Sequence, residues 1–363
     1  MLKSAVQSDT IKARNIFKEQ LKMKKYLLPQ DGNFYKANLH CHTTISDGRK
    51  TPEEIKQIYK DLGYSVVAYT DHDLFIRHDD LTDAEFLALA GFELEVNDNK
   101  DVRWENKKCC HMCFIALDEE TRVQPMWHRS NYLFGNAKQN ADRVMFDENE
   151  PDYVRVFGGE GISEMMNIGR SKGFFVTYNH PTWSLEDFSD YTNYHGMHAF
   201  EMFNGGCIAA GYDDYNPRVY DDILRAGEKI YCVGSDDNHN GAPDDSRRFD
   251  SGWAFTVIKA DKLEYRTITK ALEDGNFYAS EGPEIHELWY EDGKVYIKCS
   301  DADRINCNYG TRFAKTVLSE NGVPVTQAVF EIPEKCIFFR ITVTDKQGRH
   351  ACTNAYFVED LNK

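Results

Sequence analysis

Six histidines and several acidic residues lie at the ends of short hydrophobic runs in this sequence. They occur in the segments 38–42, 46–48, 70–72, 91–93, 110–112, 179–181 and 234–239. Imidazole and carboxylate groups are the side chains that bind zinc, manganese and iron in proteins. Because these groups recur at the ends of consecutive predicted strands, they indicate a metal centre with more than one ion. The chemistry that such a centre favours is metal-assisted hydrolysis.

The spacing within two of these segments predicts ligands that share one face of the chain. Residues i and i+2 of a strand point to the same side, so His40 and His42 can bind one ion together. Asp237 and His239 repeat this spacing, and Asp236 stays open as an alternative to Asp237. A glutamate can bridge two cations held about 3.5–4 Å apart. Either Glu93, which follows a turn glycine, or Glu95, on the same side of an extended run, could take that position.

The segments between these positions predict the elements that hold them. Hydrophobic runs typical of strands cover residues 35–39, 65–69, 111–117, 174–178, 198–203 and 229–233. Helical patterns alternate with them at residues 52–62, 83–90, 161–172 and 219–226. Repeated strand–helix units predict a parallel, barrel-like sheet. The polar segment 119–160 interrupts this pattern and is expected to be an insertion that lies over the mouth of the site.

The last eighty residues have a different pattern. Short strand-like runs occur at residues 287–290, 294–299, 315–319, 327–330, 336–344 and 351–358. Asp292-Gly293, Asn321-Gly322 and Gln347-Gly348 are turn signals between these runs. We therefore predict three parts: an N-terminal helical extension over residues 1–33, a metal-dependent barrel domain over 34–282, and a small antiparallel β-sandwich over 283–363.

Composition limits the partners and the compartment. The 363 residues carry a net charge of −16 and are 41% hydrophobic, so a large core is expected and bulk electrostatic binding of nucleic acid or an anionic membrane is not. The ten cysteines are scattered, and no signal peptide or membrane span is visible, which favours a cytoplasmic protein with reduced thiols. Cys41, Cys109 and Cys110 lie beside proposed ligands, but their simplest interpretation is as small buried hydrophobic residues.

The same motifs resemble those of the PHP family, the polymerase and histidinol phosphatase phosphoesterases. The resemblance covers residues 34–282, and the segment 271–283 resembles the closing stretch of two-domain members with a C-terminal β-sandwich. It implies an α/β fold, a distorted (β/α)7 barrel, followed by that small all-β antiparallel domain. It also implies two or three divalent ions (Zn, Mn or Fe) in three ligand sets. These are His40, His42, Glu93 and Asp237; then Glu93, His111 and His180; and finally Asp47, His72 and His239. Some members have histidine at the position of Asp47, and a carboxylate there shifts the preference toward harder ions.

The expected reaction is hydrolysis of a phosphate ester of a small molecule, in which a hydroxide bridging the metals attacks phosphorus. Candidates for protonating the leaving group are Asp71, His78 and Asp236, and candidates for substrate binding are Arg77 and Arg129. We expect a small phosphorylated substrate and neither membrane nor nucleic-acid partners. Two alternatives remain at this point. One is hydrolysis of a non-phosphate bond by the same metals, and the other is a carbohydrate- or partner-binding module with an inert barrel.

Overall fold

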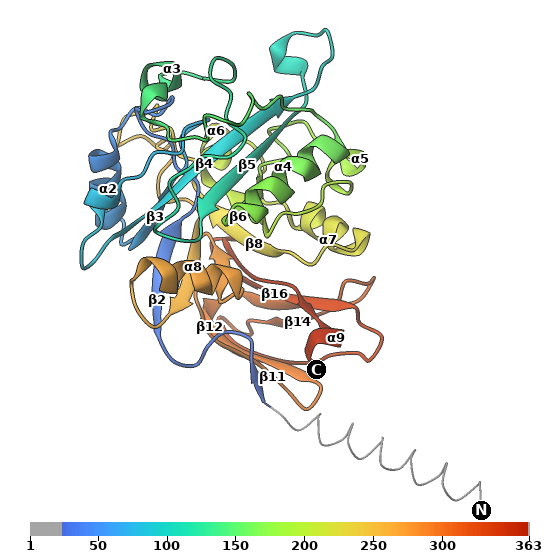
Figure 1. The fold of residues 1–363 in the computed structure, drawn as a ribbon. Coiled ribbons are helices and arrows are strands. Elements are labelled where there is room, and N and C mark those ends of the chain that lie inside the picture. The colour runs from blue at the N-terminus through green and yellow to red at the C-terminus, as the bar shows by residue number, and fades with distance from the viewer. Residues whose placement is uncertain (1–23, 362–363) are drawn as a thin grey trace, which may run out of the picture. The chain divides into compact units, whose positions relative to one another are not determined.

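The computed structural model describes residues 24–361, which form two compact units (Figure 1). One unit is Asp31–Glu281, and the other combines the described residues up to Gln30 with those from Gly282 onward. Of the helical extension expected over residues 1–33, residues 1–23 lie outside the described part of the chain. Residues 24–33 form no helix and include β1 (Lys25–Tyr26). Between residues 24 and 361, no helix is both long and apolar enough to cross a bilayer.

The unit 31–281 is built on one large mixed sheet. Its strands are β2 (Asn33–Asn38), β3 (Val66–Tyr69), β4 (Leu87–Asn97), β5 (Cys109–Ala116), β6 (Phe174–Asn179), β7 (Ala199–Asn204), β8 (Tyr231–Ser235), β9 (Phe255–Ala260) and β10 (Phe277–Ser280). They are ordered β10-β9-β2-β3-β4-β5-β6-β7-β8. Four adjacent pairs are parallel, namely β2–β3, β3–β4, β6–β7 and β7–β8.

The prediction of a parallel sheet is wrong for β5, and two strands of the sheet, β9 and β10, lie outside the predicted runs. β5 runs antiparallel to both β4 and β6, and β9 runs antiparallel to β2 and β10. The reason for β5 is the short connection from β4, which has no crossover helix of the kind that parallel strands require. Among residues 24–361 no strand ladder joins β8 to β10, so a closed (β/α)7 barrel stays a prediction.

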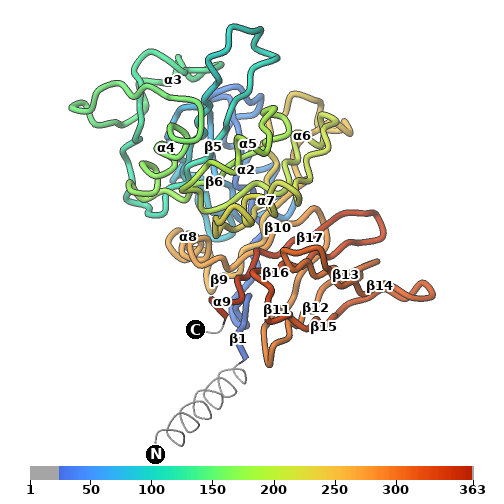
Figure 2. The backbone as a smooth tube through the Cα atoms, turned by 90° about the vertical axis from the view of Figure 1, so that its right-hand side faces the viewer, coloured from blue at the N-terminus to red at the C-terminus, as the bar shows by residue number. Residues whose placement is uncertain are grey.

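Helices flank this sheet. They are α2 (Pro52–Asp61), α3 (Ala137–Asn140), α4 (Gly159–Ser171), α5 (Phe188–Tyr191), α6 (Gly205–Ala210), α7 (Pro217–Ala226) and α8 (Tyr265–Glu273), with 3-10 turns η1 (Asp79–Leu81), η2 (Trp104–Asn106) and η3 (Ala141–Arg143). Thr51 and Glu54 form a capping box at the start of α2, and Pro52 occupies its first position. α4 lies beside β5 and β6 (Figure 1, Figure 2).

One predicted helix does not form. Residues 83–90 contain good helix formers, but residues 87–90 belong to β4 and pair in parallel with β3. Pairing with β3 and burial of every residue from Leu87 to Leu94 outweigh the local helix preference. The sheet's core includes Leu39, Val66 and Ile258, which are almost inaccessible to solvent.

The second unit contains two antiparallel sheets. One has the order β1-β11-β12-β15, with β11 (Ile285–Glu291), β12 (Lys294–Ala302) and β15 (Val325–Glu331). The other contains β14 (Ala314–Leu318), β13 (Arg304–Asn308), β16 (Phe338–Thr344) and β17 (His350–Thr353), with β18 (Tyr356–Phe357) on β16 and α9 (Val358–Leu361) after it. Asp292 and Gly293 both have positive φ and form the two-residue turn between β11 and β12, as their sequence predicts.

Candidate metal centre

The backbone brings the predicted ligands to one edge of the large sheet. The segment after β8 is joined to the segment after β2, because the Asp237 N–H donates to the His40 carbonyl (2.9 Å) and the His42 N–H donates to the Asn238 carbonyl (3.1 Å). His72, just after β3, forms an isolated parallel bridge with Glu93 on β4. Backbone hydrogen bonds alone therefore hold segments that are far apart in the sequence side by side.

The direction of β5 explains how His111 reaches the same edge. His111 lies near the start of β5, whereas the other ligands follow the ends of their strands. Because β5 is antiparallel to its neighbours, its start lies opposite the ends of β4 and β6. The register pairs His111 with Glu95 on one side and with Asn179 on the other.

Glu93 lies at the centre of this group. Its carboxylate is fully buried and lies within 3.5 Å of five imidazoles. These contacts are to His40 Nε2 (3.1 Å), His42 Nε2 (3.3 Å), His72 Nδ1 (3.2 Å), His111 Nδ1 (3.1 Å) and His180 Nε2 (3.5 Å). Glu95, the alternative left open by the sequence, contacts only His111 among these rings, at 3.4 Å. The geometry therefore favours Glu93 for the bridging position.

Asp237 completes the inner part of the group. Its Oδ1 lies 3.2 Å from His40 Nε2 and 3.0 Å from His42 Nε2, and its Oδ2 lies 3.6 Å from His180 Nε2. Its backbone has φ of 50°, in the left-handed region that most side chains avoid. Gly206 makes this approach possible, because a Cβ there would lie 2.8 Å from the Asp237 carbonyl oxygen.

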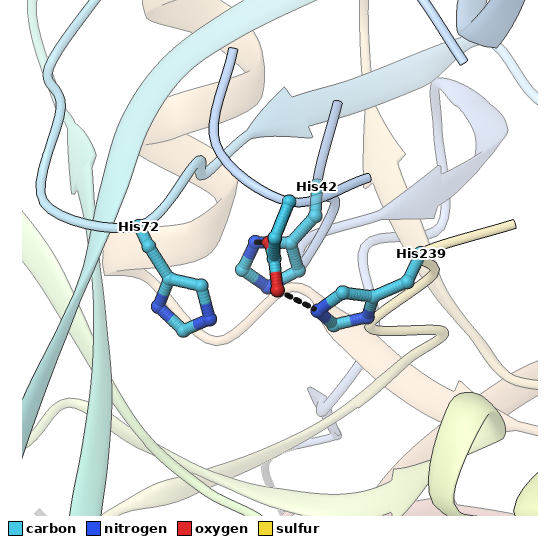
Figure 3. A group of neighbouring side chains, drawn as sticks. His42, His72 and His239 are labelled. Carbon is cyan, nitrogen blue, oxygen red and sulfur yellow. Dashed lines mark ion pairs between the residues drawn. The ribbon is translucent and has the colours of Figure 1, made fainter. Parts of the chain in front are cut away.

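A second group lies next to the first and nearer to solvent. His42, His72 and His239 point toward one another, and a dashed line marks the ion pair made by His239 (Figure 3). That pair joins His239 Nε2 to Asp47 Oδ2 at 3.2 Å, and Asp47 Oδ1 lies 3.7 Å from His42 Nδ1. The His42 ring centroid is 4.4 Å from that of His72 and 4.3 Å from that of His239.

The described residues form four groups whose ligand atoms lie within 4.8 Å of one another. They are His40, His42, Glu93 and Asp237; His42, Asp47, His72 and His239; His72, Glu93 and His111; and His40, His180 and Glu201. The first group has the same members as the first expected ligand set, and the second adds His42 to the third set. The expected trio of Glu93, His111 and His180 is divided between the last two groups, although His180 still contacts Glu93.

Unpaired polar atoms show that these residues fit a bound cation. Within the described chain, His42 Nδ1, Glu93 Oε2, His111 Nε2 and Asp237 Oδ1 are buried and have no hydrogen-bond partner. Burying such atoms without a partner costs free energy, and an ion is one of the few things that offsets this cost. Four such atoms in one small volume, all of ligand type, are the arrangement expected of a metal centre.

The carboxylates and imidazoles of the group shift one another's pKa values strongly. Burial opposes the charged form of Glu93, but His40, His111 and His72 outweigh it and hold the pKa of Glu93 well below its usual value. Burial likewise opposes the charged form of Asp237, and His40 outweighs it, so this pKa is also well below its usual value. Burial lowers the pKa of His72 to about 3, which leaves a neutral imidazole. Burial opposes the charged forms of His40, His42 and His111, but the neighbouring carboxylates outweigh it and raise the pKa values of these three rings well above the usual value. A bound cation would therefore displace protons from these imidazoles.

Three residues that sequence reasoning missed hold the ligands in place. Glu201 Oε1 lies 3.1 Å from His40 Nδ1, while the other nitrogen of this ring faces Glu93. Glu201 Oε2 accepts hydrogen bonds from the His180 N–H (3.1 Å) and from Asn204 Nδ2 (2.9 Å). Asn204 also donates to Asp237 Oδ2, at 3.0 Å. Asn179, the third, donates to Glu93 Oε1, at 3.3 Å.

Glu201 could have been found from the sequence. It is an acidic residue inside the hydrophobic run 198–203, and a charged side chain there needs a buried partner.

The three candidates for the general acid do not line the cavity over the ligands. Asp71 instead holds the loop after β2, because its carboxylate accepts hydrogen bonds from the N–H and side chain of both Thr43 and Ser46. His78 is buried against the ring of Tyr69, with centroids 4.8 Å apart. These positions do not favour Asp71 or His78 as the general acid, and both assignments stay predictions.

Asp236 also has a structural position. Its carboxylate accepts hydrogen bonds from the backbone N–H groups of Gly252, Trp253 and Ala254 and from the Tyr59 hydroxyl. Burial raises the pKa of Asp236 to about 6 against these hydrogen bonds. Asp237 lines the cavity and Asp236 does not, so the geometry favours Asp237 as the ligand.

The two candidate substrate-binding arginines also lie elsewhere. Arg77 pairs with Asp79 and donates to the Thr121 carbonyl (3.2 Å). Arg129 pairs with Asp152 at 2.6 Å. Neither lines the cavity over the ligands, so the structure does not favour them as substrate-binding residues, and both assignments stay predictions.

A cavity of about 360 Å³ opens over the centre. Its lining consists of Asp47, His72, Glu93, Glu95, Trp104, His111, Phe134, His180, Trp183, Gly206, Cys207, Ala210, Asp237, His239 and Asp250. Phe134 is the contribution of the segment 119–160, which was expected to lie over the mouth. Cys41, Cys109 and Cys110 are buried and are not in this lining, as their simplest interpretation predicts.

Comparison with known proteins gives structural neighbours but no family match. No protein-family model and no curated protein sequence matches this chain. A solved structure from Bacteroides vulgatus, a two-domain protein containing a predicted PHP-like metal-dependent phosphoesterase, is 15% identical with a TM-score of 0.42 and covers 92% of this chain and 98% of its own.

Two further neighbours cover less of the chain. A candidate metal-dependent phosphoesterase from Bifidobacterium adolescentis is 18% identical with a TM-score of 0.38 and covers 60% of this chain and 92% of its own. An amidohydrolase from Chromobacterium violaceum, solved with bound sulfate and no metal, is 14% identical with a TM-score of 0.31. It covers 56% of this chain and 87% of its own.

Proposed function

We propose that this cavity is the active site of a metal-dependent hydrolase that cleaves phosphate esters of small molecules. The observation that carries the proposal is the position of Glu93. Its buried carboxylate lies among five imidazoles, and its Oε2 has no hydrogen-bond partner. A carboxylate in that position suits the bridging of two cations. We also propose that the sheet closes in a barrel-like way. The backbone hydrogen bonds between the segments that follow β2 and β8 support this closure.

The four groups of ligand atoms would hold two or three divalent ions. His40, His42, Glu93 and Asp237 would hold the most buried one, and Asp47, His72 and His239 the most exposed. Bound ions of this kind supply Lewis-acid activation of a phosphoryl oxygen and of water near neutral pH. Asp47 adds an oxygen ligand to the exposed group, which favours manganese or iron over zinc there.

Other residues of the chain position the proposed ligands. Glu201 fixes the orientation of the His40 ring, and Asn204 fixes the carboxylate of Asp237, so both ligands are positioned before substrate arrives. Asp71 and Asp236 hold the loops that carry His42 and Asp237 by accepting hydrogen bonds. Such support matters because a displacement of about 1 Å in a catalytic group can reduce the rate about a hundredfold.

A substrate panel tests this function. Phosphomonoesters, phosphodiesters, lactones and amides are assayed with the purified protein in added manganese, zinc or iron(II). The proposal expects turnover of a phosphate ester and its loss in His40→Ala, Glu93→Ala and Asp237→Ala, each still folded by circular dichroism. Turnover of only lactones or amides would establish the alternative hydrolase. Absence of any turnover, together with carbohydrate or protein binding by residues 283–363, would establish the binding module.

A further inference from the structure

Aromatic side chains form two walls of the cavity beside the proposed ligands. Trp183 lies edge-on to the rings of His111 and His180, with centroid distances of 5.3 and 5.4 Å. Trp104, in η2, continues this wall at 6.4 Å from Trp183. On another side Phe134 lies 5.7 Å from the ring of His72. These three aromatic side chains therefore flank the space in which a substrate would meet the metals.

Two of these side chains are left open to solvent. Trp104 is 59% exposed and Phe134 is 55% exposed, although large aromatic side chains are usually covered in a folded protein. Both come from loops outside the sheet core, so neither is needed to fill it. A flat ring that enters the cavity would cover them.

The same cavity has no cationic side chain. In the part of the chain that the structure describes, its lining includes five carboxylates and four imidazoles but no lysine or arginine. Arg103, next to Trp104, points to solvent with its side chain 81% exposed and pairs with Glu105 at 3.1 Å. Two bound divalent ions would leave the five carboxylates with a net charge of about −1, and three would leave about +1. A site of this charge suits a singly charged phosphate better than a doubly charged one.

We propose that the site prefers phosphodiesters carrying one negative charge and an aromatic group on the ester oxygen that is not released, which Trp104, Trp183 and Phe134 hold. This inference rests on the proposed phosphoesterase function and names its substrate class. In the reaction, the oxygen of water forms a bond to phosphorus and the bond from phosphorus to the leaving oxygen breaks. One proton of the water ends on the departing oxygen, so the products are a phosphomonoester and an alcohol or phenol.

Three substrates that share one leaving group separate the effect of the phosphate charge from the effect of binding a second ring. Bis(4-nitrophenyl) phosphate, methyl 4-nitrophenyl phosphate and 4-nitrophenyl phosphate all release 4-nitrophenolate, which is followed by absorbance in added manganese. We expect kcat/KM to be at least about tenfold higher for the bis-aryl diester than for either other ester, since ring stacking is worth about tenfold or more. The kcat/KM of thymidine 5′-(4-nitrophenyl) phosphate then shows whether a nucleoside or a simple aryl group is bound better. A higher kcat/KM for either of these diesters than for the methyl diester supports the aromatic site.

Variants test which side chains hold the ring. Trp104→Ala and Phe134→Ala should each lower the bis-aryl to methyl ratio of kcat/KM by about three- to tenfold, mainly through KM. Trp104→Phe should restore much of the ratio. Phe188→Ala is the matched control, because Phe188 is also 59% exposed but does not line the cavity. Its ratio should equal that of the wild type.

A binding measurement gives a second readout. Diphenyl phosphate, titrated into zinc-loaded protein, should change the tryptophan fluorescence, whereas dimethyl phosphate at the same concentration should not. Equal effects of the two ligands would overturn the aromatic site.

Failure of this inference is distinguishable from failure of the proposed function. If none of the esters is hydrolysed with any metal, the phosphoesterase function itself fails. If 4-nitrophenyl phosphate is the best substrate, the function stands and the preference for a single charge is wrong. If Trp104→Ala and Phe134→Ala keep the wild-type ratio, the aromatic walls do not bind substrate.

Discussion

Replacing Arg155 with methionine should destabilise the protein strongly, because it breaks a buried ion pair beside the metal centre. Arg155 Nη2 lies 2.6 Å from Asp73 Oδ1, and each side chain is only 4% exposed. Arg155 also donates to the Glu95 carbonyl (2.8 Å) and lies over the ring of Tyr132 (4.3 Å). Removing one partner of a buried pair leaves an uncompensated charge and costs about 3–5 kcal/mol.

Arg129→Met is the matched control. Arg129 pairs with Asp152 at the same distance of 2.6 Å and in the same segment, but these side chains are 38% and 36% exposed. An exposed pair contributes about 0–1 kcal/mol. Urea unfolding, monitored in chelator at pH 8, compares the two variants with the wild type. The double variant Asp73→Asn with Arg155→Met should recover most of the loss, since no buried charge remains.

The loss in Arg155→Met should also depend on pH. Burial raises the pKa of Asp73 to about 6 despite the neighbouring Arg155. Because this folded pKa is above the unfolded one, the contribution of Asp73 is fully present below about pH 4 and is lost as pH rises through 6. Without Arg155 the folded pKa rises further, so the variant and the wild type should differ least at pH 5 and most at pH 8. Equal losses in Arg155→Met and Arg129→Met at pH 8 would refute the reasoning.

Two other predictions concern buried carboxylates. Glu201→Gln should weaken metal binding about 10- to 100-fold, measured by competition with a chromophoric chelator, because Glu201 orients the His40 ring; unchanged affinity would show that the orientation is set elsewhere. Burial raises the pKa of Glu186 to about 8, although Tyr178 and Tyr194 donate hydrogen bonds to its carboxylate. Because this folded pKa lies above the unfolded one, the wild type should lose about 4 kcal/mol of stability between about pH 4 and pH 8. The variant Glu186→Gln should keep this stability over the same range. Parallel stability curves of wild type and Glu186→Gln over this range would contradict that prediction.

The sequence predicts the site better than the sheet that carries it. The spacing of His40 and His42, and of Asp237 and His239, depends only on local strand geometry, and all four side chains lie in the same group of contacts. The choice between Glu93 and Glu95, and between Asp236 and Asp237, needs the direction of each side chain. That direction depends on long-range contacts such as the hydrogen bonds from residues 252–254 to Asp236.

The direction of strand β5 could not be obtained from hydrophobic pattern alone, because parallel and antiparallel strands with both faces buried have the same composition. The helix predicted at residues 83–90 is also wrong, because pairing with a neighbouring strand determines the secondary structure of a short apolar run. Trp104 lies in the short 3-10 turn η2, and Trp183 and Phe134 lie in irregular segments. None of these segments has a periodicity from which to infer a shared cavity.

Metal content is the most direct test of the central claim. Protein purified with and without added manganese, zinc or iron is dialysed, and its ions are counted by inductively coupled plasma mass spectrometry for the wild type, Glu93→Gln and Glu95→Gln. We expect at least two divalent ions per wild-type chain, a loss of at least one ion in Glu93→Gln, and a content close to that of the wild type in Glu95→Gln. A wild-type protein that takes up no ion, or a Glu95→Gln variant that loses as much metal as Glu93→Gln, would contradict the account.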